Sequence, residues 1–243
     1  MISFVGACVK NLITCIKYLF DRQVKFKEIL NQAATFSFDS LPISLAIVMI
    51  AAAVIALQVS KQFLMTGAED YVGGSIAIVL IRELAPGFAA LAISARAGTA
   101  ICAEIANMKV TEQVDAIKTM NVNPVGYYFT PKIISAALTT PMVVLLAEVC
   151  GIVAGMIISN SAIGLHFNRY INTVWLWLNT KDIYISLLKA SIFGILITTV
   201  TATQGYKTTG GAVDVGNAVT QAAIKSTIVI LIADFIINMI FYL

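Results

Sequence analysis

Four charged side chains lie in segments that are otherwise apolar enough to cross a membrane. Arg82 and Glu83 are adjacent, and Lys189 and Asp234 occur in two later apolar segments. Charges at membrane depth are costly, and they usually pair with one another or face a polar cavity. Arg82 and Lys189 could bind an anionic group such as a phosphate, while Glu83 and Asp234 would neutralise them in the empty site. The residues alone leave open an equal alternative, in which the four form ion pairs that only hold helices together.

A second candidate surface follows the Arg-Glu pair. Residues 96–130 are too polar for a membrane core, yet apolar residues recur within them at i, i+4 and i+7, the spacing of one helical face. These residues are Val110, Val114 and Ile117. Thr111 is predicted to cap this helix, and Glu112 and Asp115 lie in its first turn, where the helix dipole favours acids. Either the protein's own loops or a partner protein must cover the apolar face.

Five uncharged or nearly uncharged segments could position these groups. Each approaches the roughly 20 residues that a helix needs to cross a bilayer. We predict spans at about 42–60, 71–95, 131–159, 183–203 and 217–240. Pro86-Gly87 should break the second span, because proline removes a backbone donor, and breaks in membrane helices often mark substrate sites. Glu148 is an isolated acid in the third span, and the sequence assigns it no role.

Composition agrees with a membrane protein. Of 243 residues, 59% are hydrophobic and 12% are charged, and the mean hydropathy is +0.89, which is far from the balance of a soluble domain. We expect an all-α integral membrane protein with one domain over residues 1–243. The net charge of +3 is modest, which argues against nucleic acid as a partner.

Signatures of catalysis are lacking in the sequence. The four cysteines show no metal-ligand spacing, and Gly205–Gly211 lacks the Lys and Ser/Thr of a phosphate-binding loop. We expect no metal, no cofactor and no enzymatic activity in this chain, so energy from ATP would enter through another subunit.

The N-terminal residues 1–30 have the pattern of a helix lying in the headgroup plane. Lys10, Thr14, Lys17 and Asp21 share one helical face, and apolar residues occupy the rest. A cleaved signal peptide is the alternative. It is disfavoured because no basic residue precedes Lys10 and no small-residue cleavage site follows the apolar run.

The distribution of Lys and Arg predicts the orientation, since cytoplasmic segments are enriched in both. With the N-terminus inside, the cytoplasmic segments contain Lys10, Lys17, Arg22, Lys25, Lys27, Arg96, Lys109, Lys118, Lys132 and Lys207. The outside segments contain only Lys61, Arg169 and Lys181. We therefore expect a cytoplasmic N-terminus, a C-terminus outside, and residues 96–130 on the cytoplasmic side.

Two further features concern the outer half. Residues 160–182 are predicted as the longest outer loop, with Trp175 and Trp177 at the depth where amphipathic aromatic rings settle. Gly151 and Gly155 form a GxxxG pair, which permits close helix approach either within the chain or in a dimer.

Several blocks of the sequence resemble the signature of the MlaE-type permease family. The blocks are RELAP at 82–86, ARAGTAICAEIANMKVTEQVDAI at 95–117, NP at 123–124, GAEDYVGG at 67–74 and GYKTTGGAVDVGNAVTQA at 205–222. The resemblance covers nearly all of the chain from Leu41 onward.

This resemblance implies the membrane subunit of an ABC transporter that moves phospholipids across the cell envelope and maintains outer-membrane lipid asymmetry. It implies a homodimer in a bacterial inner membrane with a periplasmic C-terminus, a cytoplasmic ATPase subunit, an MCE-domain lipid carrier and, in many systems, a STAS-domain protein. The implied lipid cavity contains Arg82, Glu83, Lys189 and Asp234. The implied coupling helix, between spans two and three, engages the ATPase through Glu104, Val110, Glu112, Val114, Asp115 and Ile117.

Two other functions compete with this interpretation. An ion- or proton-coupled secondary transporter would use Glu83, Glu148 and Asp234 as proton carriers and would run without ATP. A membrane anchor that transports nothing would bind no lipid, but the broken second span argues against it.

Overall fold

Five long helices dominate the fold. The computed structural model describes residues 2–20 and 26–242, and within these residues there are helices and turns but no strands. In the part of the chain that the structure describes, five helical stretches are long and apolar enough to cross a membrane: Lys27–Thr66, Glu69–Val110, Pro124–Ile163, Thr180–Tyr206 and Ala212–Phe241. The prediction of an all-α, five-span membrane protein is thereby confirmed.

The helices are longer than the predicted spans. Their bounds are α1 Ile2–Phe20, α2 Phe26–Thr66, α3 Val72–Val79, α4 Ala85–Ile93, α5 Thr99–Val110, α6 Gln113–Thr119, α7 Pro124–Ile163, α8 Phe167–Trp177, α9 Thr180–Tyr206 and α10 Ala212–Tyr242. A short 3-10 turn at Glu69–Tyr71 precedes α3. Hydropathy marks only the apolar middle of each helix, so it misses the polar turns that continue the same backbone hydrogen bonding.

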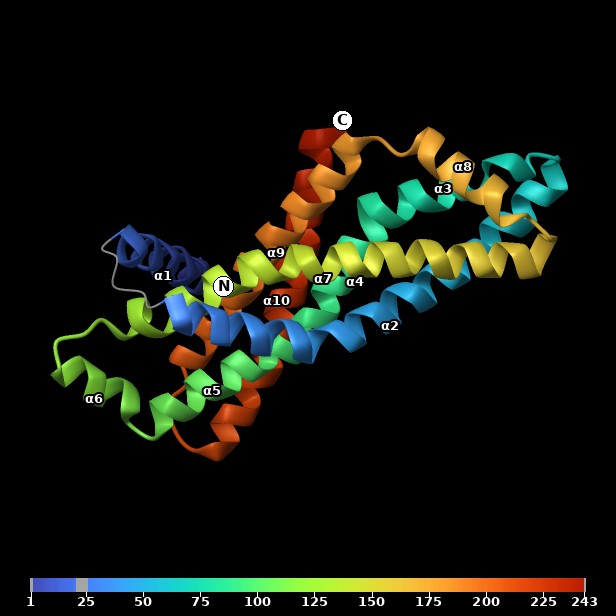
Figure 1. The fold of residues 1–243 in the computed structure, drawn as a ribbon. Coiled ribbons are helices and arrows are strands. Elements are labelled where there is room, and N and C mark those ends of the chain that lie inside the picture. Colours follow the sequence, from blue (N-terminus) through green and yellow to red (C-terminus); the bar gives the residue numbers. More distant parts are fainter. Residues whose placement is uncertain (1, 21–25, 243) are drawn as a thin grey trace.

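The long helices form one elongated bundle (Figure 1). α2 packs along α7, α7 along α9 and α9 along α10, while the segment from α3 to α5 runs among them. α1, α6 and the turn between α9 and α10 lie toward one end. α8, the start of α9 and the end of α10 lie toward the other end. The predicted inside and outside segments are therefore separated along the bundle.

α1 is docked on the end that contains α6. Asn11 Nδ2 donates to Thr203 Oγ1 at 3.0 Å, and the Tyr18 ring lies so close to Gly126 that an added Cβ would be 2.4 Å from it. Val5, Val9 and Ile13 keep apolar side chains exposed. The predicted interfacial segment of residues 1–30 is thus divided: α1 ends at Phe20, Asp21 lies outside the described residues, and residues 26–30 belong to α2.

The second span changes helical type twice. π-helical segments occur at Leu80–Leu84 and Ser94–Gly98, between α3, α4 and α5. π-turns inside α-helices are rare and occur frequently at functional sites. The irregularity predicted at Pro86-Gly87 lies just before the proline, in the segment that contains Arg82 and Glu83. Pro86 itself occupies the first turn of α4, where its missing N–H costs little.

Residues 160–182 are not a loop, as the sequence had suggested, because they contain α8. Tyr170 and Val174 are buried on one face of this helix, whereas its polar residues lowered the hydropathy of the whole segment. The Gly151 and Gly155 pair serves packing within the chain. An added Cβ would lie 2.9 Å from Leu80 Cδ2 at Gly151 and 2.8 Å from the Tyr170 hydroxyl at Gly155.

Candidate functional site

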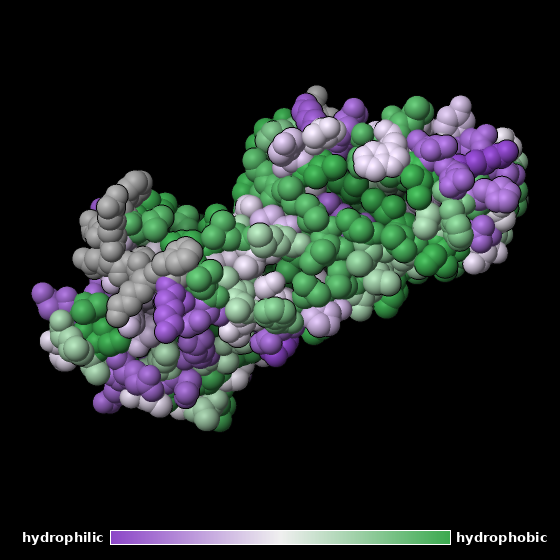
Figure 2. Space-filling model, in the orientation of Figure 1, coloured by the Kyte–Doolittle hydropathy of each residue, from purple (hydrophilic) through white to green (hydrophobic). Residues whose placement is uncertain are grey.

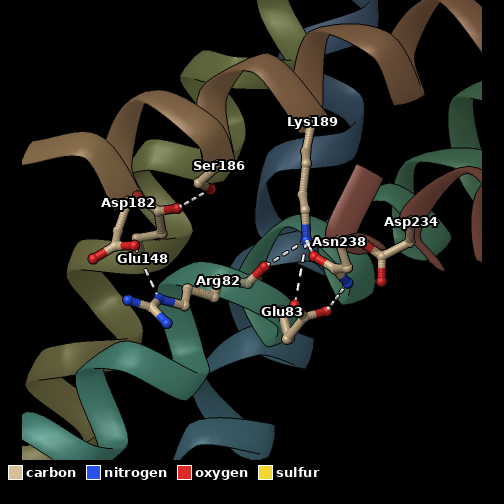
Figure 3. Close-up of polar contacts among 8 residues, drawn as sticks. All are labelled: Arg82, Glu83, Glu148, Asp182, Ser186, Lys189, Asp234 and Asn238. Atoms are coloured by element: carbon tan, nitrogen blue, oxygen red, sulfur yellow. Dashed lines mark hydrogen bonds and ion pairs between the residues drawn. The ribbon is translucent and has the colours of Figure 1, made fainter. Parts of the chain in front are cut away.

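A buried cluster of polar groups joins α9, α10 and the first π-helical segment (Figure 3). At its centre Lys189 Nζ has no exposed surface, and it donates to the Arg82 carbonyl at 2.8 Å and to Asn238 Oδ1. It forms ion pairs with Glu83 Oε1 at 3.4 Å and with Asp234 Oδ1 at 3.1 Å. We call Glu83, Lys189, Asp234 and Asn238 the lysine cluster.

Local structure explains how these groups meet. Asp234 and Asn238 are four residues apart on α10 and therefore share one helical face. Glu83 lies in the π-helical segment, whose wider turn directs side chains differently from an α-helix. The side chains of Glu83 and Asp234 remain 42% and 21% exposed, respectively. The positive centre is thus enclosed, while the side chains of both carboxylates remain partly exposed.

The Arg82 side chain points away from the lysine cluster. Its Nε forms an ion pair with Asp182 Oδ1 at 2.9 Å, and Figure 3 shows this pair beside Glu148 and Ser186. Asp182 also belongs to the capping box of α9, in which it receives the backbone N–H of Asn179. Of the four residues predicted to form one site, the structure therefore unites the side chains of Glu83, Lys189 and Asp234 and places the Arg82 side chain in a second, adjacent group.

A polar pocket of about 450 Å³ opens beside this second group. Its walls comprise Arg82, Asn179, Thr180, Lys181, Asp182 and Phe241. The pocket lies at the start of α9 and the end of α10, at the end of the bundle that contains α8. Among the described residues of its lining, the two cations, Arg82 and Lys181, outnumber the one acid, Asp182.

Four polar residues of this region were not predicted as site members. Asn238 bridges the lysine cluster, because its Nδ2 also donates to Glu83 Oε2 at 2.8 Å. Asp182 holds Arg82, and Ser186 Oγ donates to Glu148 Oε1. The spacing of Asn238 from Asp234, and of Asp182 from the capping residue Asn179, were the signals that could have identified two of them.

The predicted coupling helix is short and is capped differently from the prediction. α6 spans Gln113–Thr119, and Glu112, not Thr111, occupies its N-cap position with a left-handed φ of 61°. The prediction for Thr111 is wrong because its hydroxyl donates back to the Asn107 carbonyl at 2.8 Å. Val110 is the last residue of α5, so it precedes α6.

The side chains of α6 divide into a packed side and an exposed side. Val114 is buried and Ile117 is partly buried, while Glu112 is exposed. Asp115 accepts hydrogen bonds from Lys109 and Lys118 at 2.7–3.1 Å, and these bonds lower the pKa of Asp115 to about 2. The apolar face of α6 is therefore mostly covered by the chain itself, and the exposed surface is charged.

Glu104 lies apart from the α6 surface. Lys132 Nζ, almost fully buried, donates to Glu104 Oε2 at 2.7 Å and to Gln32 Oε1 at 3.1 Å. These contacts tie α5, which precedes α6, to α7 and α2.

Known membrane proteins are similar to this chain over most of its length. The model of the family described as Permease MlaE matches residues 29–240. A probable ABC transporter permease protein of Rickettsia prowazekii (strain Madrid E) is 34% identical over 214 residues, covering 88% of this chain and 83% of the relative. A probable ABC transporter permease protein of Synechocystis sp. is 31% identical over 221 residues, covering 91% of this chain and 84% of the relative.

A plant protein is also similar. The Arabidopsis thaliana protein TRIGALACTOSYLDIACYLGLYCEROL 1, chloroplastic, is 30% identical over 186 residues, which is 76% of this chain and 53% of the plant protein. The matched family model covers both charged groups, α6 and nearly all residues of the five spans. The chain therefore belongs to the MlaE permease family and is the multi-pass membrane subunit of an ABC transporter, which works with a partner ATPase subunit.

Proposed function

We propose that this permease moves phospholipids across a bacterial cell envelope and thereby contributes to the lipid asymmetry of the outer membrane. The observation that carries the proposal is the fully buried Lys189 ammonium, held by two partly exposed carboxylates among apolar helices. The ammonium is enclosed while the side chains of Glu83 and Asp234 are partly exposed, and this arrangement suits the exchange of one anionic partner for another. Here an arriving phosphate could replace the carboxylates around Lys189 without first exposing the lysine to water.

Both chemical halves of a phospholipid find suitable surroundings. Acyl chains need apolar walls, which the five spans provide, and the headgroup needs a few polar groups at fixed positions. Lys189 supplies positive charge, which Glu83 and Asp234 compensate in the empty site, and the Arg82 side chain lies in the adjacent polar pocket. The Arabidopsis relative is named after a glycerolipid, and this name is consistent with a lipid substrate.

The second span offers a mechanical connection to the ATPase. Helical structure is continuous from Glu69 to Val110, and α6 follows after two residues. A displacement of α6 by ATPase closure would therefore act on the helix that contains Arg82 and Glu83. We propose that the exposed side of α6, with Glu112 and Asp115, contacts the ATPase. ATP would be hydrolysed by that subunit and not by this chain.

The assembly that we propose is the one that the resemblance of the sequence blocks implies. We propose a homodimer in the bacterial inner membrane with a cytoplasmic N-terminus and a periplasmic C-terminus. An MCE-domain protein would receive lipid at the α8 end, and a STAS-domain protein would bind the ATPase. The orientation is supported by Lys109, Lys118 and Lys207 at the α6 end, since basic residues favour the cytoplasmic side.

The test is lipid transport in vesicles that contain the permease with its ATPase. Replacing Lys189 by Met should abolish most ATP-dependent phospholipid transport and leave ATPase association intact. The matched control is Lys225→Met, because Lys225 is on α10 but donates to Gln204 near the other end of the bundle. Normal transport by Lys189→Met, or wild-type transport without ATP, would contradict the proposal.

A further inference from the structure

A second cavity lies under α8, separate from the lysine cluster. It measures about 440 Å³, within the range of about 300–1,000 Å³ typical of ligand sites. Apolar side chains of α7 and α8 form most of its wall, among them Val149, Ile152, Ile171 and Trp175. Among the described residues that line it, Glu148 is the one acidic or basic residue. Figure 2 shows a hollow in the apolar surface beside α8, with hydrophilic atoms at its bottom. The function proposed above makes no use of this cavity.

Close packing fixes the helix that covers the cavity. An added Cβ would lie 2.4 Å from the Tyr170 carbonyl oxygen at Gly73 and 2.7 Å from Trp177 Cγ at Gly74. Two adjacent glycines of α3 thus let α8 approach more closely than any other residue would permit. α8 is therefore held against α3 by close packing, and its position defines the cavity beneath it.

The cavity is accessible from the lipid-facing side of the bundle. Val149 and Val153 both line it, and these residues are 54% and 44% exposed. In a protomer placed in a bilayer, apolar residues exposed on a span can contact acyl chains. An acyl chain could therefore enter sideways from the bilayer without crossing a polar barrier.

The cavity adjoins the polar pocket of Arg82. Three pairs of consecutive residues divide between the two hollows: Ile81 and Arg82, Leu178 and Asn179, and Asp182 and Ile183. In each pair the apolar residue lines the cavity and the polar residue lines the pocket. One backbone framework thus separates an apolar compartment from a compartment that contains Arg82 and Lys181.

We propose that these paired compartments form a second lipid site, in which the cavity holds one acyl chain of an anionic glycerophospholipid and the polar pocket holds its headgroup. This inference rests on the proposed lipid function. Asp182 compensates the charge of Arg82 in the pocket, but Lys181 and the positive end of the α9 dipole leave a net positive charge, so the pocket favours an anionic headgroup over a zwitterionic one. Because the Arg82 carbonyl also contacts Lys189, the second site adjoins the lysine cluster and could load it from the outer leaflet.

Photolabelling tests the position of the acyl chain. The probe is phosphatidylglycerol with a diazirine near the end of one acyl chain, added to the permease–ATPase complex, and the labelled residues are identified by mass spectrometry. Adducts should concentrate on the cavity walls around Ile152 and Ile171. Val149→Trp should fill the cavity and reduce these adducts at least several-fold, and the smaller Val149→Phe should reduce them less.

The control is Leu146→Trp on the same helix, since Leu146 is exposed but does not line the cavity. Its labelling should equal that of the wild type. Equal labelling in the Val149 and Leu146 variants would overturn the site and assign the adducts to ordinary bilayer contact.

A second comparison tests the headgroup. The same diazirine on phosphatidylcholine should label the cavity walls several-fold less than the phosphatidylglycerol probe, and Lys181→Gln should narrow this difference. Equal labelling by both probes would overturn the anionic preference. The Lys189→Met transport assay keeps the two proposals separate. Lost transport without cavity adducts would remove only the second site, whereas cavity adducts with normal Lys189→Met transport would remove only the proposed role of the lysine cluster.

Discussion

Asn238 Nδ2 donates to Glu83 Oε2 at 2.8 Å, while Asn238 Oδ1 accepts from Lys189 Nζ. One amide of α10 therefore fixes both members of an ion pair formed by α9 and the second span. Because the amide donates to the acid and accepts from the base, it orients the pair without changing its net charge. A lipid phosphate that bound Lys189 would have to compete with this amide as well as with the carboxylates.

The first prediction concerns this bridge. Asn238→Leu keeps the approximate volume and removes both hydrogen bonds. It should lower the free energy of unfolding by about 1 kcal/mol, the lower part of the range for losing a buried partner, because Glu83 is partly exposed. Transport should fall, because Glu83 and Lys189 lose their fixed orientation. Thermal unfolding and vesicle transport measure the two effects, with the exposed neighbour Met239→Leu as control; equal behaviour of both variants would exclude a bridging role.

The second prediction concerns Arg82 and Asp182. Asp182→Asn retains an oxygen that can cap α9 but removes the charge facing Arg82. The single variants Asp182→Asn and Arg82→Gln should each be destabilised, and the double variant should be less destabilised than their sum. The coupling free energy should be about 0.5–3 kcal/mol. A double-mutant cycle of unfolding measures it, and strict additivity would mean that the ion pair contributes no stability.

The third prediction concerns α6. Replacing both Glu112 and Asp115 with Lys should uncouple transport from ATP hydrolysis and weaken ATPase association, while the spans remain folded. At position 115 the new lysine would face Lys109 and Lys118. Asp70→Lys is the control, because it reverses an exposed acid at the α8 end of the bundle. Co-purification of the ATPase is the measurement, and unchanged association and transport would argue strongly against α6 as the contact surface.

The fourth prediction concerns pH. Hydrogen bonds from Lys109 and Lys118 lower the pKa of Asp115 to about 2 in the folded chain. Because this pKa is lowered, the stabilisation that Asp115 contributes to the folded chain is fully present above the ordinary pKa of Asp. It is lost only as the pH falls toward about 2. ATPase association should therefore show no step from Asp115 between about pH 5 and pH 8. A carboxyl resonance of Asp115 that titrated near pH 4 would show that these lysines do not hold it in solution.

The fifth prediction concerns the seat of α8. Gly74→Ala would place a methyl group against Trp177, so α8 must shift, and we expect a loss of about 1–3 kcal/mol in unfolding free energy. Trp177 fluorescence should also change. Gly87→Ala is the matched control in the same span, because an added Cβ meets nothing within 4 Å there. Equal stability of the two variants would contradict the close packing of α3 on α8.

Physical rules of membrane helices identified much of this molecule from sequence. The cost of buried charge singled out Glu83, Lys189 and Asp234, and the structure brings these side chains together. The same rule could not predict where the Arg82 side chain points, because that direction depends on a π-turn that no residue pattern predicts. Asp182 was missed because it occurs in a polar stretch assigned to a loop, where an acid costs nothing. α8 was missed because it lies in the same polar stretch. Its packing also depends on two glycines of α3, which is distant in the sequence.

The two π-helical segments also change which side chains share a face along the second span. Each adds one residue to a turn, and a residue of α-helix corresponds to about 100° of rotation. A helical wheel drawn through the whole of Glu69–Val110 would therefore be out of phase by about 200° at its end. Faces deduced on such a wheel for Glu104 would be almost opposite to the true ones, so residues before Leu80 and after Gly98 need separate wheels.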